Sequence, residues 1–225
     1  MKRFSASMVL IILAVLAVAQ VAMAQPFGVT TENGTQKTGT GTTATSVAIT
    51  GGNVTEVNIT AAQITGRWAG FWGSITAGIN LTDGVQTFYA WTVSNVTGAA
   101  VYAVNGSVTD WDLMQRANDT HMPVNLQGEA TDNFNNTFNS SETFTVGTSR
   151  SIDNVKYAMT WQDGVQGTLL KSYALTTSDT NAEIFAAKAV GDADSFINGV
   201  EADFQLIVPA QSAYATPYEF YLELP

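Results

Sequence analysis

The feature that most constrains the fold is an alternation of apolar and polar residues in short runs that end at turn residues. Between residues 74 and 81 every second residue is apolar, namely Ile75, Ala77, Ile79 and Leu81. A period of two predicts a β-strand with one buried face, because successive side chains of a strand point to opposite sides of the sheet. Short strands of this kind, separated by turns, are typical of an antiparallel all-β domain.

Asp-Gly and Asn-Gly pairs mark the predicted hairpin turns, because these residues adopt the positive φ angles that tight turns need. They occur at Asp83-Gly84, Asn105-Gly106 and Asp163-Gly164. The predicted strands around and after them cover residues 85–93, 100–104, 108–111, 155–161, 169–175, 204–208 and 218–224. We therefore expect an antiparallel β-sandwich or jelly roll of about ten strands. Only Thr180 to Val190 has helical spacing, which predicts one short helix.

The first 24 residues have the pattern of a cleavable signal peptide. Lys2 and Arg3 precede an apolar run from Met8 to Val21, and Ala22 and Ala24 form an A-x-A cleavage site. The run is too short to span a bilayer comfortably. We therefore expect a mature chain that begins at Gln25, has no membrane insertion after cleavage, and is extracellular or at the cell surface.

Residues 25–60 are rich in Thr and Gly and are predicted to form an arm before the β-sandwich domain of residues 61–225. Within the arm, Ser46 to Thr50 and Val54 to Thr60 regain β-branched alternation. This part of the arm is therefore a possible donor strand, which could pair within its own molecule or with a neighbouring one.

The charge and the cysteine content exclude several classes of protein. The formal net charge is −10, and it becomes −12 when the signal peptide leaves with Lys2 and Arg3. Such a chain is not expected to bind nucleic acid. It contains no cysteine, so the fold cannot rest on disulfides.

The strongest local motif is the N-glycosylation acceptor N-x-[ST], which is enriched over the chance expectation for this composition. Nine copies occur, at Asn33, Asn53, Asn58, Asn80, Asn95, Asn105, Asn118, Asn135 and Asn139. They predict an exported glycoprotein, although a Thr- and Asn-rich composition produces some such motifs by chance.

Catalysis finds little support in the residues. His121 is the one histidine, and without cysteine the common triads and zinc sites are missing. A glycosidase that uses two carboxylates remains possible, because it needs no histidine or cysteine. The strand around Glu219 is similar to the nucleophile strand of jelly-roll xylanases. A solvent-facing strand position explains Glu219 equally well, so we expect no enzyme and no organic cofactor.

Two acidic pairs are candidate calcium ligands, because carboxylate oxygens are the ligands that calcium prefers. Asp192 and Asp194 are the better pair, and Asp110 and Asp112 are the second. Neither follows the EF-hand pattern, and solvated loop acids are the simpler interpretation of both.

The aromatic stretch around Trp68, Phe71 and Trp72 has two interpretations. Glycines beside these rings could leave them open to stack on sugars, which makes Trp68 and Trp72 candidate carbohydrate-binding residues. Alternatively the rings fill the core, as large aromatic side chains usually do. Three further tryptophans, Trp91, Trp111 and Trp161, are predicted to be core residues.

The stretches W-A-G-F-W-G-S-I-T-A-G-I-N-L, F-Y-A-W, A-D-F-Q-L-I-V-P and Y-E-F-Y-L-E-L resemble those of secreted archaeal β-sandwich surface proteins, over roughly residues 66–225. The resemblance implies an envelope, sheath or filament subunit that forms a homo-oligomer or polymer. Some extracellular archaeal filaments assemble when each subunit donates an N-terminal strand to the next subunit. The alternatives are a carbohydrate-binding module or adhesin and, third, the glycosidase.

Overall fold

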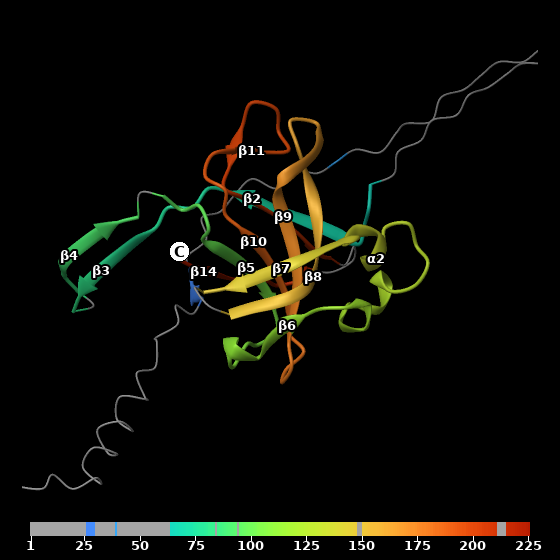
Figure 1. The fold of residues 1–225 in the computed structure, drawn as a ribbon, viewed down its shortest axis with the longest axis horizontal. Helices are drawn as coiled ribbons and strands as arrows, with labels where there is room; N and C mark the ends of the chain where they lie inside the picture. The colour runs from blue at the N-terminus through green and yellow to red at the C-terminus, as the bar shows by residue number, and fades with distance from the viewer. Residues whose placement is uncertain are drawn as a thin grey trace, which may run out of the picture.

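The computed structural model describes residues 26–29, 39, 64–83, 85–93, 95–147, 150–210 and 215–225. The fold is all-β and sandwich-like, and its strand pairings are antiparallel (Figure 1), which confirms the predicted fold class. The predicted signal peptide and most of the predicted arm, including Ser46 to Thr60, lie outside the described residues.

The main sheet has eight strands. Its spatial order is β1 (Phe27–Gly28), β14 (Glu219–Glu223), β5 (Ala100–Asn105), β10 (Glu183–Lys188), β9 (Val165–Thr177), β8 (Arg150–Gln162) and β7 (Ser140–Val146), and β6 (Met114–Arg116) also pairs with β9.

Three further strand pairs accompany the main sheet. They are β2 (Trp68–Gly73) with β13 (Phe204–Pro209), β3 (Gly78–Thr82) with β4 (Thr87–Thr92), and β11 (Ala193–Asp194) with β12 (Glu201–Ala202). Helical structure in the described residues is limited to α2 (Phe134–Thr137) and the 3-10 turns η1 (Trp111–Leu113), η2 (Asp119–His121) and η3 (Val124–Leu126).

One face of the central strands is covered by the β2–β13 pair and by the segment around α2. Val101 and Ala103 of β5 and Phe185 of β10 enter this core, where Leu206 of β13 and Phe138 meet them. The Ser172 hydroxyl of β9 donates to the Ile207 carbonyl at 3.2 Å and accepts from the Ile207 N–H at 3.1 Å. This pair of bonds fixes β13 across β9, so the two sheets form two packed layers.

The opposite face of the same strands encloses a second core, because the main sheet curls. Tyr102 and Ile184 from the central strands pack there with Phe144 of β7, and the Tyr102 and Phe144 ring centroids are 6.3 Å apart. The Glu223 side chain of β14 accepts a hydrogen bond from the Gly147 N–H at the end of β7. Thus β14, near one edge of the main sheet, contacts the end of β7 at the other edge.

The predicted helix from Thr180 to Val190 is wrong, since this segment contains strand β10. The strand lies between β5 and β9 in the middle of the main sheet, with Ile184 and Ala186 on one side and Phe185 and Ala187 on the other. Both faces are buried, so the strand is continuously apolar and lacks the alternation that identifies a half-exposed strand.

The predicted hairpins have different outcomes. Asp163 and Gly164, with φ of 45° and 77°, form the tight turn between β8 and β9 as expected. Asp83 likewise lies in the turn between β3 and β4. The hairpin at Asn105-Gly106 is wrong, because β10 and β14 already occupy both edges of β5, and the chain leaves the sheet toward η1.

The beginning of the predicted arm is part of the main sheet. Phe27 and Gly28 pair with Leu222 and Tyr221 of β14, and the Val29 N–H donates to the Phe220 carbonyl at 3.2 Å. The β-domain therefore includes residues before the predicted boundary at residue 61.

We predict that Glu223→Gln lowers the free energy of unfolding by about 2–3 kcal/mol. Each oxygen of the buried carboxylate accepts one hydrogen bond, and the amide of glutamine has only one oxygen, so one of the two bonds is lost. The side chain is only 3% exposed and accepts from the Tyr102 hydroxyl at 2.5 Å as well as from Gly147. Urea unfolding measures the effect. Glu219→Gln, on the exposed part of the same strand, is the matched control and should change stability by less than about 0.5 kcal/mol. Equal effects of the two substitutions would contradict this account.

Candidate functional site

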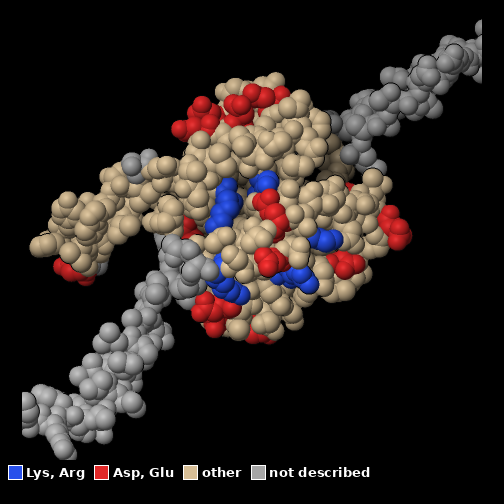
Figure 2. All heavy atoms as spheres, in the orientation of Figure 1, with Lys and Arg blue, Asp and Glu red and all other residues tan. Residues whose placement is uncertain are grey.

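The β3–β4 hairpin projects from the body of the molecule (Figure 1). Within the described residues, β3 and β4 pair with each other and with no other strand, and the Val93 N–H donates to the Ala77 carbonyl at its base. Figure 2 shows the hairpin as a neutral extension with acidic atoms at its tip, where Asp83 lies. A two-stranded hairpin is only marginally stable in water by itself, so this element is expected to have a partner.

One face of the hairpin is entirely apolar. Ile79 lies opposite Trp91, and Leu81 lies opposite Tyr89. These four side chains are between 49% and 56% exposed, and the Tyr89 and Trp91 rings lie 4.7 Å apart with a tilt of 58°. A contiguous apolar strip of this kind indicates an interaction surface.

The turn of the hairpin is held by the Asp83 carboxylate. It accepts from the N–H groups of Val85 at 2.9 Å and Gln86 at 2.7 Å. The bond from Gln86, followed by that from Val85, lowers the pKa of Asp83 below its ordinary value. The turn is therefore well defined although it lies in solvent, and it positions β4 against β3.

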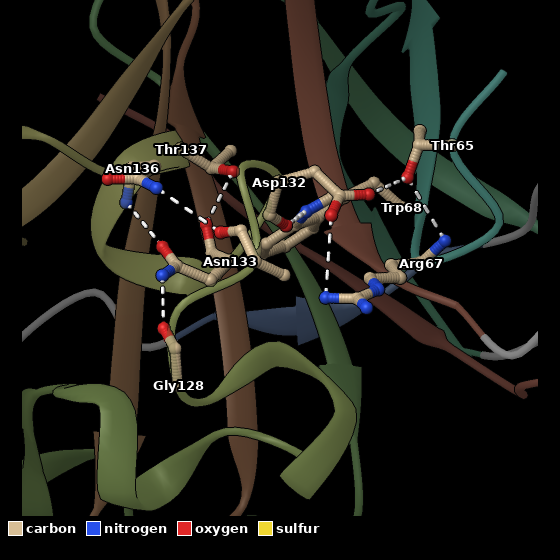
Figure 3. Close-up of polar contacts among 9 residues, drawn as sticks. Thr65, Arg67, Trp68, Gly128, Asp132, Asn133, Asn136 and Thr137 are labelled. Atoms are coloured by element: carbon tan, nitrogen blue, oxygen red, sulfur yellow. Dashed lines mark hydrogen bonds and ion pairs between the residues drawn. The ribbon is translucent and has the colours of Figure 1, made fainter. Parts of the chain in front are cut away.

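Trp68 is a core residue, as the second interpretation of the aromatic stretch expected. It is 8% exposed, its ring lies 5.6 Å from that of Phe138, and its Nε1–H donates to the Asp132 carbonyl at 2.7 Å. Figure 3 shows the same loop held by Arg67, 3.4 Å from the Asp132 carboxylate, and by the Thr65 hydroxyl, 2.6 Å from it. The faces of the Trp68 ring are covered, so this ring offers no sugar-stacking surface.

The other tryptophans divide between the core and the surface. Trp111 is buried against Tyr102, as predicted. The prediction of core positions for Trp91 and Trp161 is wrong, because Trp91 lies on the projecting hairpin and Trp161 near the tip of the β8–β9 hairpin is 58% exposed. Trp72 is 37% exposed and its ring stands at 84° to that of Phe196.

Six of the nine N-glycosylation acceptors lie in the described residues, and Asn33, Asn53 and Asn58 lie outside them. Five of the six are exposed, namely Asn80, Asn95, Asn118, Asn135 and Asn139. Asn95 and Asn118 each accept from the N–H of the Thr two residues later, at 2.8 and 3.0 Å, which is an Asx-turn. Asn105 is half-buried at the end of β5, and its Nδ2 donates to Glu183 at 3.3 Å.

We predict that Asn95 and Asn118 carry glycans and that Asn105 carries little or none. The glycan bonds to Nδ2 of asparagine, and at Asn105 this atom faces the neighbouring strand. Mass spectrometry of glycopeptides from the protein purified from its own cells measures the occupancy. Asn118→Gln should lower the intact mass by one glycan, whereas the matched control Asn105→Gln should leave the glycan mass unchanged. A larger loss from Asn105→Gln would contradict the prediction.

The acidic calcium candidates do not converge. Asp192 lies beside Asp203, a carboxylate that is occupied by backbone groups, since it accepts from the Asp192 N–H at 3.1 Å and from the Ile75 N–H at 2.6 Å. Asp194 lies in β11 opposite Glu201, and the Asp110 carboxylate caps η1 by accepting from the Asp112 N–H. No cluster of three or more metal-ligating side chains is found among the described residues.

The residues considered for catalysis have local contacts instead. His121 accepts from the Asn118 N–H at 3.1 Å in the capping box of η2. Glu219 lies opposite Val104 and accepts from the Tyr221 hydroxyl. A second carboxylate near this end of β5, which was not among the candidates from the sequence, is that of Glu183, opposite Asn105. Adjacent residues of β5 point to opposite faces, so Glu219 and Glu183 lie on opposite sides of the sheet and cannot act on one glycosidic bond.

One polar cluster on β7 and β9 was not evident from the sequence. Glu142 accepts from Lys171 at 2.6 Å and from the Tyr173 hydroxyl, and Lys171 lies over the Tyr157 ring at 4.5 Å. Burial alone would raise the pKa of Glu142, but the two hydrogen bonds and the Lys171 charge outweigh it and lower the pKa. These residues pair β7 to β9 across β8 and are satisfied by one another, so the cluster is structural.

Comparisons with protein-family models, with curated proteins and with solved structures found no match for this chain. In the part of the chain that the structure describes, no helix is long and apolar enough to cross a membrane.

Proposed function

We propose that this protein is a secreted, N-glycosylated and non-enzymatic surface protein that self-associates by adding β-strands to exposed edges, as the subunit of a filament, sheath or envelope. The observation that carries the proposal is the β3–β4 hairpin, which projects with an apolar face and pairs with no third strand among the described residues. Unpaired N–H and C=O groups along such an edge form a template for another strand.

The positions of the acceptor asparagines support this proposal. Asn80 of β3 lies opposite Ala90, on the face of the hairpin away from Ile79, Leu81, Tyr89 and Trp91. A glycan on Asn80 would therefore leave the apolar face open to a protein partner. The remaining exposed acceptors lie on the body, where glycans would meet water.

A carbohydrate-binding module or adhesin is the second candidate, because Trp72, Tyr89 and Trp91 remain partly exposed. Sugar stacking uses the flat face of an aromatic ring, and neighbouring rings in one plane would extend such a platform. Tyr89 and Trp91 are tilted by 58° and Trp72 and Phe196 by 84°, so neither pair forms a common plane. Tilted aromatic pairs are the usual arrangement in protein cores and interfaces, which favours a protein partner.

We predict that the double substitution Tyr89→Ser and Trp91→Ser weakens self-association at least thirtyfold, which corresponds to about 2 kcal/mol for loss of aromatic anchors. Light scattering across a concentration series, together with negative-stain electron microscopy, measures the mass and shape of the assemblies. Trp161→Ser is the matched control, because it removes an equally exposed tryptophan from the body. Uniformly monomeric wild-type protein would remove the proposal. Polysaccharide binding by the wild-type protein that Trp72→Ala loses would favour the second candidate.

The proposed donor segment Ser46 to Thr60 can be tested separately. Replacing these 15 residues with a Gly/Ser linker of equal length should shorten or abolish filaments while leaving β1 paired with β14. The same linker in place of residues 31–45 is the control for length and should leave assembly unchanged. Assembly that survives the first replacement would show that the donated strand comes from another part of the chain.

A further inference from the structure

We propose that the outer edge of β4 pairs with β4 of a second copy, antiparallel and about a two-fold axis through Ala90. The inference rests on the proposed self-association and specifies the partner of one of its contacts. It would join two projecting hairpins into a four-stranded sheet with the order β3, β4, β4 and β3.

The direction of the backbone groups makes this edge available. In an antiparallel ladder, hydrogen-bonded pairs alternate with pairs that are not bonded. The hydrogen bond from the Val93 N–H to the Ala77 carbonyl shows that Val93 and Ala77 form a hydrogen-bonded pair. Every second pair is of this type, so Trp91 with Ile79 and Tyr89 with Leu81 are also hydrogen-bonded pairs. The N–H and C=O groups of Ala90 and Thr92 therefore point away from β3, whereas Phe88 is the extra residue of a β-bulge, where this alternation is interrupted.

These outward groups suit a two-fold axis at Ala90. Ala90 would exchange both hydrogen bonds with Ala90 of the second copy, and each Thr92 would lie opposite the bulged Phe88 of the other copy. The sequence T-F-Y-A-W-T of β4 is almost symmetric about this region, with an aromatic residue on each side of Ala90. The same register sets each Tyr89 opposite a Trp91 on the apolar face, where cross-strand aromatic pairs stabilise a sheet.

The charge distribution favours a second copy at this edge. The formal net charge of the chain is −10, yet Asp83 is the only charged residue between positions 74 and 109. Antiparallel pairing about Ala90 directs the two hairpin tips in opposite directions, which separates the two Asp83 carboxylates by about 20 Å at roughly 3.4 Å per residue. This separation exceeds the Debye length of about 8 Å at physiological ionic strength, so the copies meet here without charge repulsion.

Two other edges of similar length, those of β3 and β7, are less suited to such a contact. β3 carries the acceptor Asn80 within the strand, and β7 begins directly after the acceptor Asn139. A glycan at either place would crowd an added strand. β4 contains no acceptor and none of the Lys or Pro residues that commonly protect an edge strand.

The absence of cysteine in the chain allows a direct test by cross-linking. Ala90→Cys in the full mature protein places one thiol per chain at the proposed axis. Directly opposite residues of a bonded pair have Cα atoms about 5.5 Å apart, which lies within the range that a disulfide spans. Under mild oxidation we expect a covalent dimer on non-reducing gels, formed at least tenfold faster than by the control Val85→Cys at the more exposed tip.

Two further variants test the register. Asn80→Cys lies on the same face as Ala90, but two such residues would be separated by three strand spacings, roughly 14 Å, and should not cross-link. A mixture of Phe88→Cys and Thr92→Cys proteins should form the mixed dimer, whereas each protein alone should not. This mixture also provides the test if Ala90→Cys fails to fold.

The outcomes separate this inference from the proposed function. Equal cross-linking rates for Ala90→Cys and Val85→Cys, in a protein that light scattering shows to assemble, would overturn the β4 contact and leave self-association standing. Cross-linking of Phe88→Cys or Thr92→Cys alone would overturn the register. Monomeric behaviour of the wild-type protein and of every variant would overturn both proposals.

Discussion

The burial of β5 and β10 on both faces is the constraint on which the rest of the structure depends. Two apolar faces require two covers, which the β2–β13 layer and the curl of the main sheet toward β7 supply. Tyr102 of β5 is fully buried, so its hydroxyl needs a partner inside the protein. Glu223 accepts that bond and the bond from Gly147 together, and thereby holds β14 and the end of β7 around the second core.

The turn residues and the alternation in the sequence predicted most of the strands, including β5, which ends at Asn105-Gly106, and missed β10. β8, β13 and β14 fall close to their predicted ranges, and Asp163-Gly164 forms its turn because two residues determine that geometry locally. The segment from Thr180 to Val190 was misassigned because a strand buried on both sides has no period of two. The Asn105-Gly106 hairpin failed for a non-local reason, since strands from residues 183–188 and 219–223 occupy both edges of β5.

The candidate site was harder to predict than the fold, because the exposure of a strand's apolar side chains depends on whether another layer packs against that strand. Trp111 and Trp91 both lie in segments whose alternating pattern predicts a strand. Trp111 nevertheless packs on Tyr102, whereas Trp91 lies on a hairpin that no described layer covers. Trp68 could be assigned from the sequence either to the core or to an open surface, and what holds it in the core is a bond to Asp132, a residue 64 positions away. Local pattern identifies a strand, whereas only the assembled tertiary structure determines whether its apolar face is internal.

In the proposed assembly the chain must stay in solution and still bind a second copy, and different parts of the structure suit these two requirements. The acidic residues and the exposed acceptor asparagines other than Asn80 lie mainly on the body, where charge and glycans would keep molecules apart. The hairpin has the opposite character, since its apolar residues are grouped on one face and its one carboxylate is at the tip. An edge can recruit another strand only where neither like charge nor a glycan opposes the approach. β4 meets both conditions, so under the proposed pairing a strongly acidic chain would bind a second copy at this strand while the charged body opposes unspecific contacts.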